Sequence, residues 1–376
     1  NEPNETKRGG DPATVTLNIS DAYTYGLTGD AVDGTDAENK SSSLELSVFN
    51  DPPTPDPLVG ESGNPGYVKV AVDASKQFKQ QLTVTEGTSK IFVAVVNMNV
   101  GNVATYAALQ AKIDGAYAAA NPLKAEAGKF EMSGEKKNVS VAAGTTTYLT
   151  VNVARLASKV DVPVTTNVVL DLGETEIDKL WGENSGVTNA SLSFAFDGFT
   201  IINGIDKSDV LFVGNSDGDD RKVNAATGLY DWGLWTKTGK STIKSEFDAS
   251  HHYTKSYVGE VNGDYFLDGA EGRKTVYFYE NLPERVTVPT PEYPTIGSKA
   301  ETVVSMMVRG TLSTSVAGNA PLTRYWRVNF CKDEDHYTLR NVEYSVSISR
   351  SYTAGQDNPE QAEKEKPDIP DTNKPV

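Results

Sequence analysis

The stretch NVSVAAGTTTYLTVNVARLASKVDVPV, residues 138–164, decides how this chain is divided. Polar and apolar residues alternate from Tyr148 to Arg155, and this period of two predicts a half-buried strand. A second β-rich run begins at Val160, so one β-domain ends and another begins with almost no linker. Arg155 and Lys159 flank the change. We expect them to be packing and pairing residues at the domain junction, although a solvated side chain is the commoner state of a surface lysine.

The composition of the 376-residue chain is typical of many short strands joined by turns. Thr, Val, Tyr and Ser are plentiful, and 32 Gly and 18 Pro punctuate the sequence. The length suits two domains of roughly 150 to 200 residues each. A formal charge of -16 argues against nucleic acid as a partner, because neutralising phosphates requires a basic face. The same charge is compatible with an extracellular surface.

The single cysteine, Cys331, excludes an intrachain disulfide and a cysteine-based metal cluster. A buried small hydrophobe is favoured over a reactive thiol. No run approaches the ~18 to 20 apolar residues of a membrane-spanning helix. The chain opens at Asn1 without Met, which is compatible with a mature or trimmed chain from which a signal peptide has been removed.

Changes in composition predict four segments. Residues 1–12 are polar and without periodicity, so they are expected to form a flexible tether. The first β-domain covers residues 13–156 and the second covers residues 157–352. A weakly periodic region at 206–264, too long for an ordinary connection, is expected to be an inserted loop region of the second domain. Residues 353–376 are acidic and rich in Pro, which predicts a disordered tail.

Hydrophobic periodicity places the elements inside these domains. Apolar residues at Tyr106, Leu109, Ile113 and Tyr117 are three or four positions apart, which predicts a short amphipathic helix over residues 104–119. Period-two or continuous apolar runs predict strands at residues 13–20, 43–50, 67–72, 78–85 and 90–97, and in the second domain at 160–164, 167–172, 190–196, 199–203, 275–280, 302–311, 325–330 and 341–349.

Motifs that would indicate catalysis or a cofactor are missing from the sequence. Acidic residues at 214–221 have the spacing of a calcium loop, but the required Glu is replaced by Ala226, so a solvated acidic turn is favoured. His251, His252 and His336 are the only histidines, and adjacent histidines on a strand point to opposite faces, which disfavours a zinc site. Neither a G-x-S-x-G elbow nor a phosphate-binding glycine loop occurs. We therefore expect no enzyme activity, no cofactor and no metal.

The aromatic cluster Tyr230, Trp232 and Trp235 has two interpretations. It could form a surface on which carbohydrate stacks, as a site of adhesion. It could equally pack beneath its own long loop, and this interpretation is favoured.

Four segments together resemble a known family. They are KIFVAVVN at residues 90–97, FEMSG at 130–134 leading to the V-x-V-x-R-L-x-x-K-V pattern at 151–160, TVYFYENLPE at 275–284, and HYTLRNVEYSVSIS at 336–349. In this combination, and in this order over most of the chain, the sequence resembles the Bacteroidales fimbrillins, the type V pilins.

The resemblance implies a mainly β chain of two transthyretin-like Greek-key β-sandwich domains in tandem, with a short helix in the first. It also implies export through the outer membrane as a lipoprotein precursor, and polymerisation on the cell surface by strand exchange. In that scheme proteolysis after an Arg removes the first strand, and an extended C-terminal segment of a neighbouring subunit fills the groove. The physical basis is β-augmentation, in which a strand supplied in trans satisfies an unpaired edge.

Residues 13–20 of this chain match the removable strand, and the alternation of Val15, Leu17 and Ile19 suits an exchangeable plug. Two features depart from the family pattern. Lys40 is the only basic residue between this strand and the next, so no Arg follows the strand. The chain also ends at Val376 without an alternating run that could act as a donor strand. Either the sequence stops within a Pro-rich spacer, or the subunit only receives a strand and caps a tip.

The leading functional hypothesis is therefore a structural subunit of a cell-surface fimbrium that supports adhesion, of the shaft type. Its expected partners are other pilin subunits, anchor or tip pilins, and ligands on host or bacterial surfaces. The alternative is a tip or accessory fimbrial adhesin that binds glycan or protein. A secreted glycoside hydrolase is disfavoured. A pair of carboxylates at the distance found in glycosidases is possible among the 51 acidic residues, but the sequence alone cannot select one.

Overall fold

The computed structural model of the chain forms two compact units, each described separately below. The first unit comprises Asn1–Ala120, Ala125–Ala157 and Lys207–Ser250, and the second comprises Asn121–Lys124, Ser158–Asp206 and His251–Val376. The structure describes residues 12–21, 24–26, 31–32, 34–50, 55–56, 66–70, 78–118, 120–163, 167–211, 222–224, 229–231, 253–254, 266–268, 274–281, 285–288, 295–298, 303–328, 338 and 340–365. In these residues the chain is mainly β, which confirms that part of the predicted fold class.

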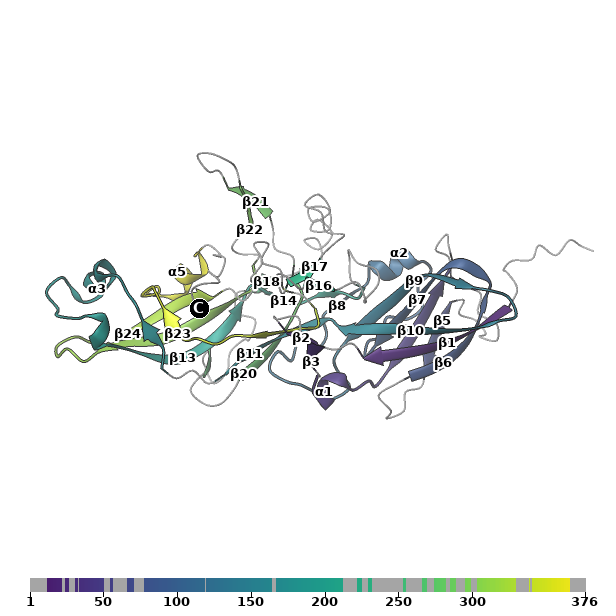
Figure 1. Cartoon of the computed structure of the whole chain (residues 1–376), viewed down its shortest axis with the longest axis horizontal. Helices are drawn as coiled ribbons and strands as arrows, with labels where there is room; N and C mark the ends of the chain where they lie inside the picture. Colours follow the sequence, from purple (N-terminus) through teal and green to yellow (C-terminus); the bar gives the residue numbers. More distant parts are fainter. Residues whose placement is uncertain are drawn as a thin grey trace, which may run out of the picture. The chain divides into compact units, whose positions relative to one another are not determined.

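A seven-stranded sheet forms the first unit (Figure 1). Its strand order is β5 (Tyr67–Val70), β4 (Leu44–Phe49), β7 (Gly87–Val96), β9 (Met132–Val141), β10 (Thr146–Arg155), β1 (Pro12–Asp21) and β6 (Phe78–Thr85). β1 runs parallel to β10, whereas the other pairings in this order are antiparallel. Strands predicted at residues 13–20, 43–50, 78–85 and 90–97 are confirmed within a few residues.

The sheet of the first unit surrounds an apolar core to which β4 and β7 contribute most. Every residue of β4 is buried, and the last five residues of β7 are also buried. In the first half of β10, from Thr146 to Thr150, alternate residues are exposed. In the second half Val151 and Val153 are buried, as the period of two predicts. Gly144 has a φ of +69° in the turn that joins β9 to β10, a conformation that favours glycine.

Shorter elements complete the first unit. They are β2 (Thr24–Gly26) paired with β3 (Ala31–Val32), β8 (Ile113–Asp114) paired with β15 (Ser208–Asp209), β16 (Lys222–Asn224) paired with β17 (Leu229–Asp231), and the helices α1 (Asp36–Asn39) and α2 (Tyr106–Gln110). α2 is shorter than the helix predicted over residues 104–119. Tyr106 and Leu109 are buried as predicted, but Ile113 leaves the helical pattern, joins β8 and is 42% exposed.

Residues 207–211 belong to the first unit. The prediction from the sequence was that the whole region 206–264 is an inserted loop region of the second domain. β15 pairs with β8, the Val210 amide donates to the Lys112 carbonyl at 2.9 Å, and the Ser133 hydroxyl donates to the Val210 carbonyl. Val210 and Leu211 are buried. These contacts join residues far apart in sequence, which local periodicity does not reveal.

The second unit contains a four-stranded sheet in the order β19 (Leu267–Asp268), β13 (Leu192–Ile202), β23 (Ser305–Thr314) and β24 (Leu322–Val328). It also contains the strands β20 (Lys274–Tyr279), β11 (Ala157–Val162) and β25 (Val342–Ser345), which lie side by side. The remaining elements are β12 (Val169–Leu170) paired with β26 (Arg350–Ser351), β14 (Gly204–Ile205) paired with β18 (Tyr253–Thr254), β21 (Arg285–Val288) paired with β22 (Thr295–Ser298), α3 (Glu174–Trp181), the 3-10 turn Asn189–Ser191, and α5 (Pro359–Glu363).

The first part of the predicted disordered tail is ordered in the second unit. Asn358 caps α5, since its side chain accepts a hydrogen bond from the Gln361 amide at 2.9 Å. Ala362 is fully buried in a cluster with Ile202 and Met307. The expectation of disorder from Thr353 therefore does not describe residues 353–365. Their own composition is polar, but side chains of β24 bind their backbone carbonyls.

Candidate functional site

The strand β1 lies between β10 and β6 in the sheet of the first unit (Figure 1). Eight residue pairs, from Thr14 opposite Thr146 to Asp21 opposite Val153, form the parallel pairing with β10. Eight further pairs, from Pro12 opposite Thr85 to Ile19 opposite Phe78, form the antiparallel pairing with β6. β1 is thus paired along both edges, which is the environment of an interior strand.

Val15 is the buried plug residue of β1 that the structure describes. It is 0% exposed and lies opposite Thr147 of β10 and Leu82 of β6. Leu82 and Val84 of β6 are buried as well. Fully burying a valine side chain contributes roughly 1.5–3 kcal/mol, so this position alone stabilises the strand in its place.

Leu17 and Ile19, the other two predicted plug residues, have defined register positions. Leu17 lies opposite Leu149 and Ile19 lies opposite Val151 in the pairing with β10. Their side chains fall outside the described residues. The exchange of this strand between subunits stays a prediction.

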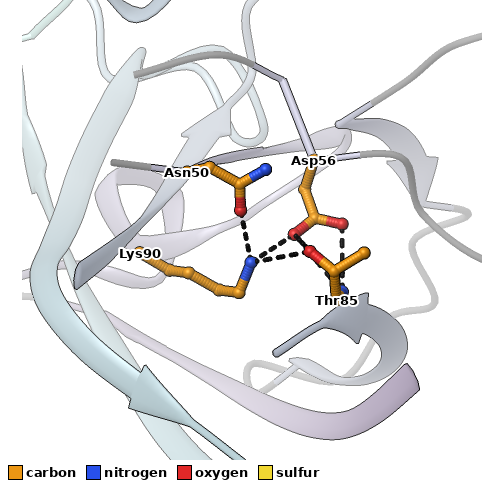
Figure 2. Close-up of polar contacts among 4 residues, drawn as sticks. All are labelled: Asn50, Asp56, Thr85 and Lys90. Carbon is orange, nitrogen blue, oxygen red and sulfur yellow. Dashed lines mark hydrogen bonds and ion pairs between the residues drawn. The ribbon is translucent and has the colours of Figure 1, made fainter. Parts of the chain in front are cut away.

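A buried polar cluster lies at the end of β6, and the sequence did not reveal it. It consists of Asn50, Asp56, Thr85 and Lys90 (Figure 2). Lys90 is 1% exposed and Asp56 is 0% exposed, and the Lys90 Nζ lies 2.5 Å from the Asp56 Oδ2. Nζ also donates to the Asn50 Oδ1 and, at 3.0 Å, to the Thr85 Oγ1. The ammonium group therefore has three acceptors.

The Asp56 carboxylate is bound as completely as the ammonium. It accepts from the Thr85 amide at 3.2 Å and 3.3 Å, and from the Thr85 hydroxyl at 2.8 Å. Burying two charges costs several kcal/mol per ion, and excellent geometry with further hydrogen bonds offsets that cost. The cluster joins the connection after β4, the end of β6 and the start of β7. The lysine at the start of the apolar run KIFVAVVN was the one signal in the sequence. Of its partners, Asn50 and Asp56 lie beside and in a Pro-rich loop, and Thr85 is the last residue of β6.

Arg155 and Lys159, predicted at the domain junction, each make contacts within their own unit. Arg155 is buried, its Nε donates to the Glu38 carbonyl at 3.0 Å, and its guanidinium also donates to the Asn39 side chain. The Lys159 Nζ lies 3.1 Å from the Glu343 carboxylate, and both side chains are about a fifth exposed, at 18% and 20%. Arg155 thus holds the end of α1, and Lys159 forms a pair between β11 and β25. Their role at a junction stays a prediction.

The predicted aromatic cluster is only partly covered by the structure. Tyr230 lies in β17, opposite Val223 of β16, and its side chain falls outside the described residues. Trp232 and Trp235 also lie outside them, as do Cys331, the three histidines and the acidic turn at 214–221. The adhesive role of the three aromatic residues stays a prediction.

Within the described residues, no group of three or more His, Cys, Asp or Glu side chains is arranged to hold a metal ion. A search of the same residues finds no helix with the length and apolar character needed to cross a membrane.

No family model matches the chain, and no curated protein matches it. Among solved structures it is similar to a candidate cell adhesion protein from Parabacteroides distasonis, with 14% identity, a TM-score of 0.49, and coverage of 89% of this chain and 88% of that one. It is also similar to a fimbrilin from Porphyromonas gingivalis, with 13% identity, a TM-score of 0.47 and coverage of 93% of each chain.

A further similar structure is the tip fimbrial protein Mfa3 from Porphyromonas gingivalis, truncated at its C-terminus, with 11% identity and a TM-score of 0.42. It covers 89% of this chain and 95% of that one. Two of these three similar structures are of fimbrial proteins.

Proposed function

We propose that this chain is a structural subunit of a cell-surface fimbrium that polymerises by strand exchange and supports adhesion, of the shaft type. In this proposal β1 is the exchangeable strand and a segment of another subunit takes its place. The proposal includes two transthyretin-like β-sandwich domains in tandem and export as a lipoprotein precursor. Its partners are other pilin subunits, including anchor or tip pilins.

The observation that carries the proposal is the position of β1 between β6 and β10. A strand at the N-terminal end of the described chain lies inside a sheet, where both of its edges are paired and Val15 is fully buried. Its removal would leave two unpaired strand edges and an apolar slot. These are the features that β-augmentation requires of an acceptor. The resemblance of the four sequence segments to the type V pilins supports the same function.

The experiment separates β1 from the folded chain without preventing folding. A specific protease site is inserted between Asp21 and Thr24, and the purified chain is cut after it has folded. A labelled peptide with the sequence Pro12–Asp21 is then added. The native fragment is first washed from the cut chain in mild denaturant, which should lower the melting temperature of that chain. We expect the added peptide to take the place of the native strand and to restore the melting temperature.

Assembly is tested by fusing the same strand sequence to the C-terminus of the cut chain through a flexible spacer. Oligomers or filaments that grow with protein concentration are expected, measured by sedimentation velocity and electron microscopy. The uncut fusion is the matched control, because its groove is already filled. A cut fusion that stays monomeric, together with a cut chain that binds no peptide, would contradict the proposal.

A further inference from the structure

We propose that the buried cluster of Asn50, Asp56, Thr85 and Lys90 positions β6 as one wall of the acceptor groove. This inference rests on the proposed function, and it identifies residues that control binding of the exchanged strand through the position of β6. The cluster lies at the end of the groove, where Thr85 is opposite Pro12 in the pairing of β6 with β1.

β6 depends on β1 for its place in the sheet. Among the described residues, β1 is the strand neighbour of β6, which stands at the end of the sheet order. Only Glu86 connects β6 to β7 along the chain, and β7 pairs with β4 and β9. When β1 leaves, β6 loses its ladder of backbone hydrogen bonds. If the groove is to accept another strand, β6 needs a contact other than its pairing with β1 to keep its position.

The cluster supplies that contact, and its hydrogen bonds among the described residues join β6 to β7 and to the segment after β4. Thr85, the last residue of β6, donates both its amide and its hydroxyl to Asp56. The Asp56 amide donates to the Val48 carbonyl of β4 at 2.9 Å, and Lys90 belongs to β7. β4 and β7 pair with each other from Leu44 opposite Val96 onward. The end of β6 is therefore fastened to a part of the sheet that stays paired when β1 is absent (Figure 2).

Burial strengthens the hydrogen bonds of the cluster. Lys90, Asp56 and Thr85 are 1%, 0% and 5% exposed, so water does not compete for their hydrogen bonds. Hydrogen bonds to charged groups are stronger than those between neutral groups. The cluster therefore holds the wall at the register and spacing that the entering strand requires.

The register of β1 sets where the ladder of the entering strand ends. The Thr14 amide donates to the Thr145 carbonyl at 3.0 Å, so the backbone groups of Thr14 face β10, as do those of Pro12 two residues earlier. Pro12 and Thr85 therefore form a pair without mutual hydrogen bonds, and the Thr85 amide points away from β1 and donates to Asp56. The pairing with β10 begins at Thr14 opposite Thr146, so an entering strand can carry proline at the position of Pro12 but needs an N–H at the position of Thr14.

The test measures binding of the labelled Pro12–Asp21 peptide to the cut full chain. Thr85→Val removes the hydroxyl that joins Asp56 to Lys90 and keeps the branched shape. We expect it to weaken peptide binding by about tenfold, which corresponds to about 1.4 kcal/mol. Thr88→Val, at an exposed threonine of β7 outside the groove, is the matched control, for which we expect unchanged binding. Asn50→Ala, which removes one half-buried acceptor, is a milder variant for which a smaller weakening is expected.

Circular dichroism and melting of the uncut variants establish that all three have folded. Two peptide variants test the end of the ladder. Pro12→Ala in the peptide is expected to bind as the native peptide does, and Thr14→Pro is expected to lose binding.

The outcomes separate this inference from the proposed function. If the native cut chain binds the peptide and Thr85→Val and Asn50→Ala bind it equally well, the inference is overturned while strand exchange stands. Equal binding of the Thr14→Pro peptide overturns the assigned end of the ladder. If the native cut chain binds no peptide, the proposed function fails and this inference fails with it.

Discussion

Lys90→Met tests whether the buried cluster stabilises the first unit. The substitution keeps a long side chain but removes an ammonium that is 1% exposed and has three acceptors. The Asp56 carboxylate, 0% exposed, would keep its hydrogen bonds from Thr85 but lose its counter-charge. Removing one partner of a buried pair costs about 3–5 kcal/mol. That is a large part of the roughly 5–15 kcal/mol by which a folded domain is stable.

Urea unfolding of the full chain, followed by circular dichroism, measures the change in the free energy of unfolding. Hydrogen exchange of β4, β6 and β7 then assigns the loss to the first unit. In the double variant Lys90→Met with Asp56→Leu, no unpaired charge remains. Its expected cost is about 1–3 kcal/mol, from the unsatisfied polar groups of Asn50 and Thr85. If Lys90→Met alone costs less than about 1 kcal/mol, as for an exposed ion pair, the reasoning is refuted.

Three further substitutions or titrations test the first unit. Val15→Ala should lower the free energy of unfolding by roughly 1–3 kcal/mol in the uncut chain, whereas Thr16→Ala, half-buried on the opposite face of β1, should change it less. Gly134→Ala should destabilise the unit by at least about 1–3 kcal/mol, because a Cβ there would overlap the backbone of β10. Burial, together with the charge of Glu45 and a hydrogen bond to it, raises the pKa of Tyr67 to about 12. The folded chain then favours the neutral phenol. Its contribution to stability is present below about pH 10 and is lost as the pH rises through about 12, and an ultraviolet titration of Glu45→Gln should give a lower pKa.

Local periodicity was sufficient to predict most strands. The run predicted at residues 13–20 is β1, Pro12–Asp21, and the run predicted at 78–85 is β6, Phe78–Thr85. Alternation along a strand reports burial of one face, which is a local property. The parallel pairing of β1 with β10 is not local, since Thr14 lies opposite Thr146, and no pattern in either strand specifies this partner.

The polar cluster shows why the candidate site could not be predicted completely. Asn50 immediately precedes the loop DPPTPDPLVGESGNPG, and Asp56 lies within it. The prolines and glycines of this loop indicate only that the segment does not form the interior of a sheet. Lys90 opens an apolar run, where a lysine is expected to be solvated. Its burial depends on three acceptors that come from separate parts of the chain. Such a cluster is specified by tertiary structure, and the sequence offers only the lysine at the start of the apolar run as a signal for it.

The C-terminal segment protects an edge of the second unit, and its removal is a further test. β24 stands at the end of its sheet, where unpaired backbone groups invite pairing with another chain. Residue Gln356 covers this edge, because the Tyr325 amide donates to its carbonyl at 3.0 Å and its own amide donates back at 2.7 Å. Arg324 and Arg327 of β24 donate to the carbonyls of Ala354 and Glu363, each at 2.8 Å.

A chain that ends at Tyr352 should therefore expose the edge of β24 and the cluster around Met307 from which Ala362 is removed. We expect it to self-associate as its concentration rises, measured by sedimentation velocity, in the absence of any cleavage near β1. A chain that ends at Glu365 is the matched control and should sediment as the full chain does. If both truncated chains behave alike, the segment has no protective role. If only the shorter one associates, assembly through β1 must be studied in chains that keep residues 353–365, because an uncovered β24 would give oligomers by another route.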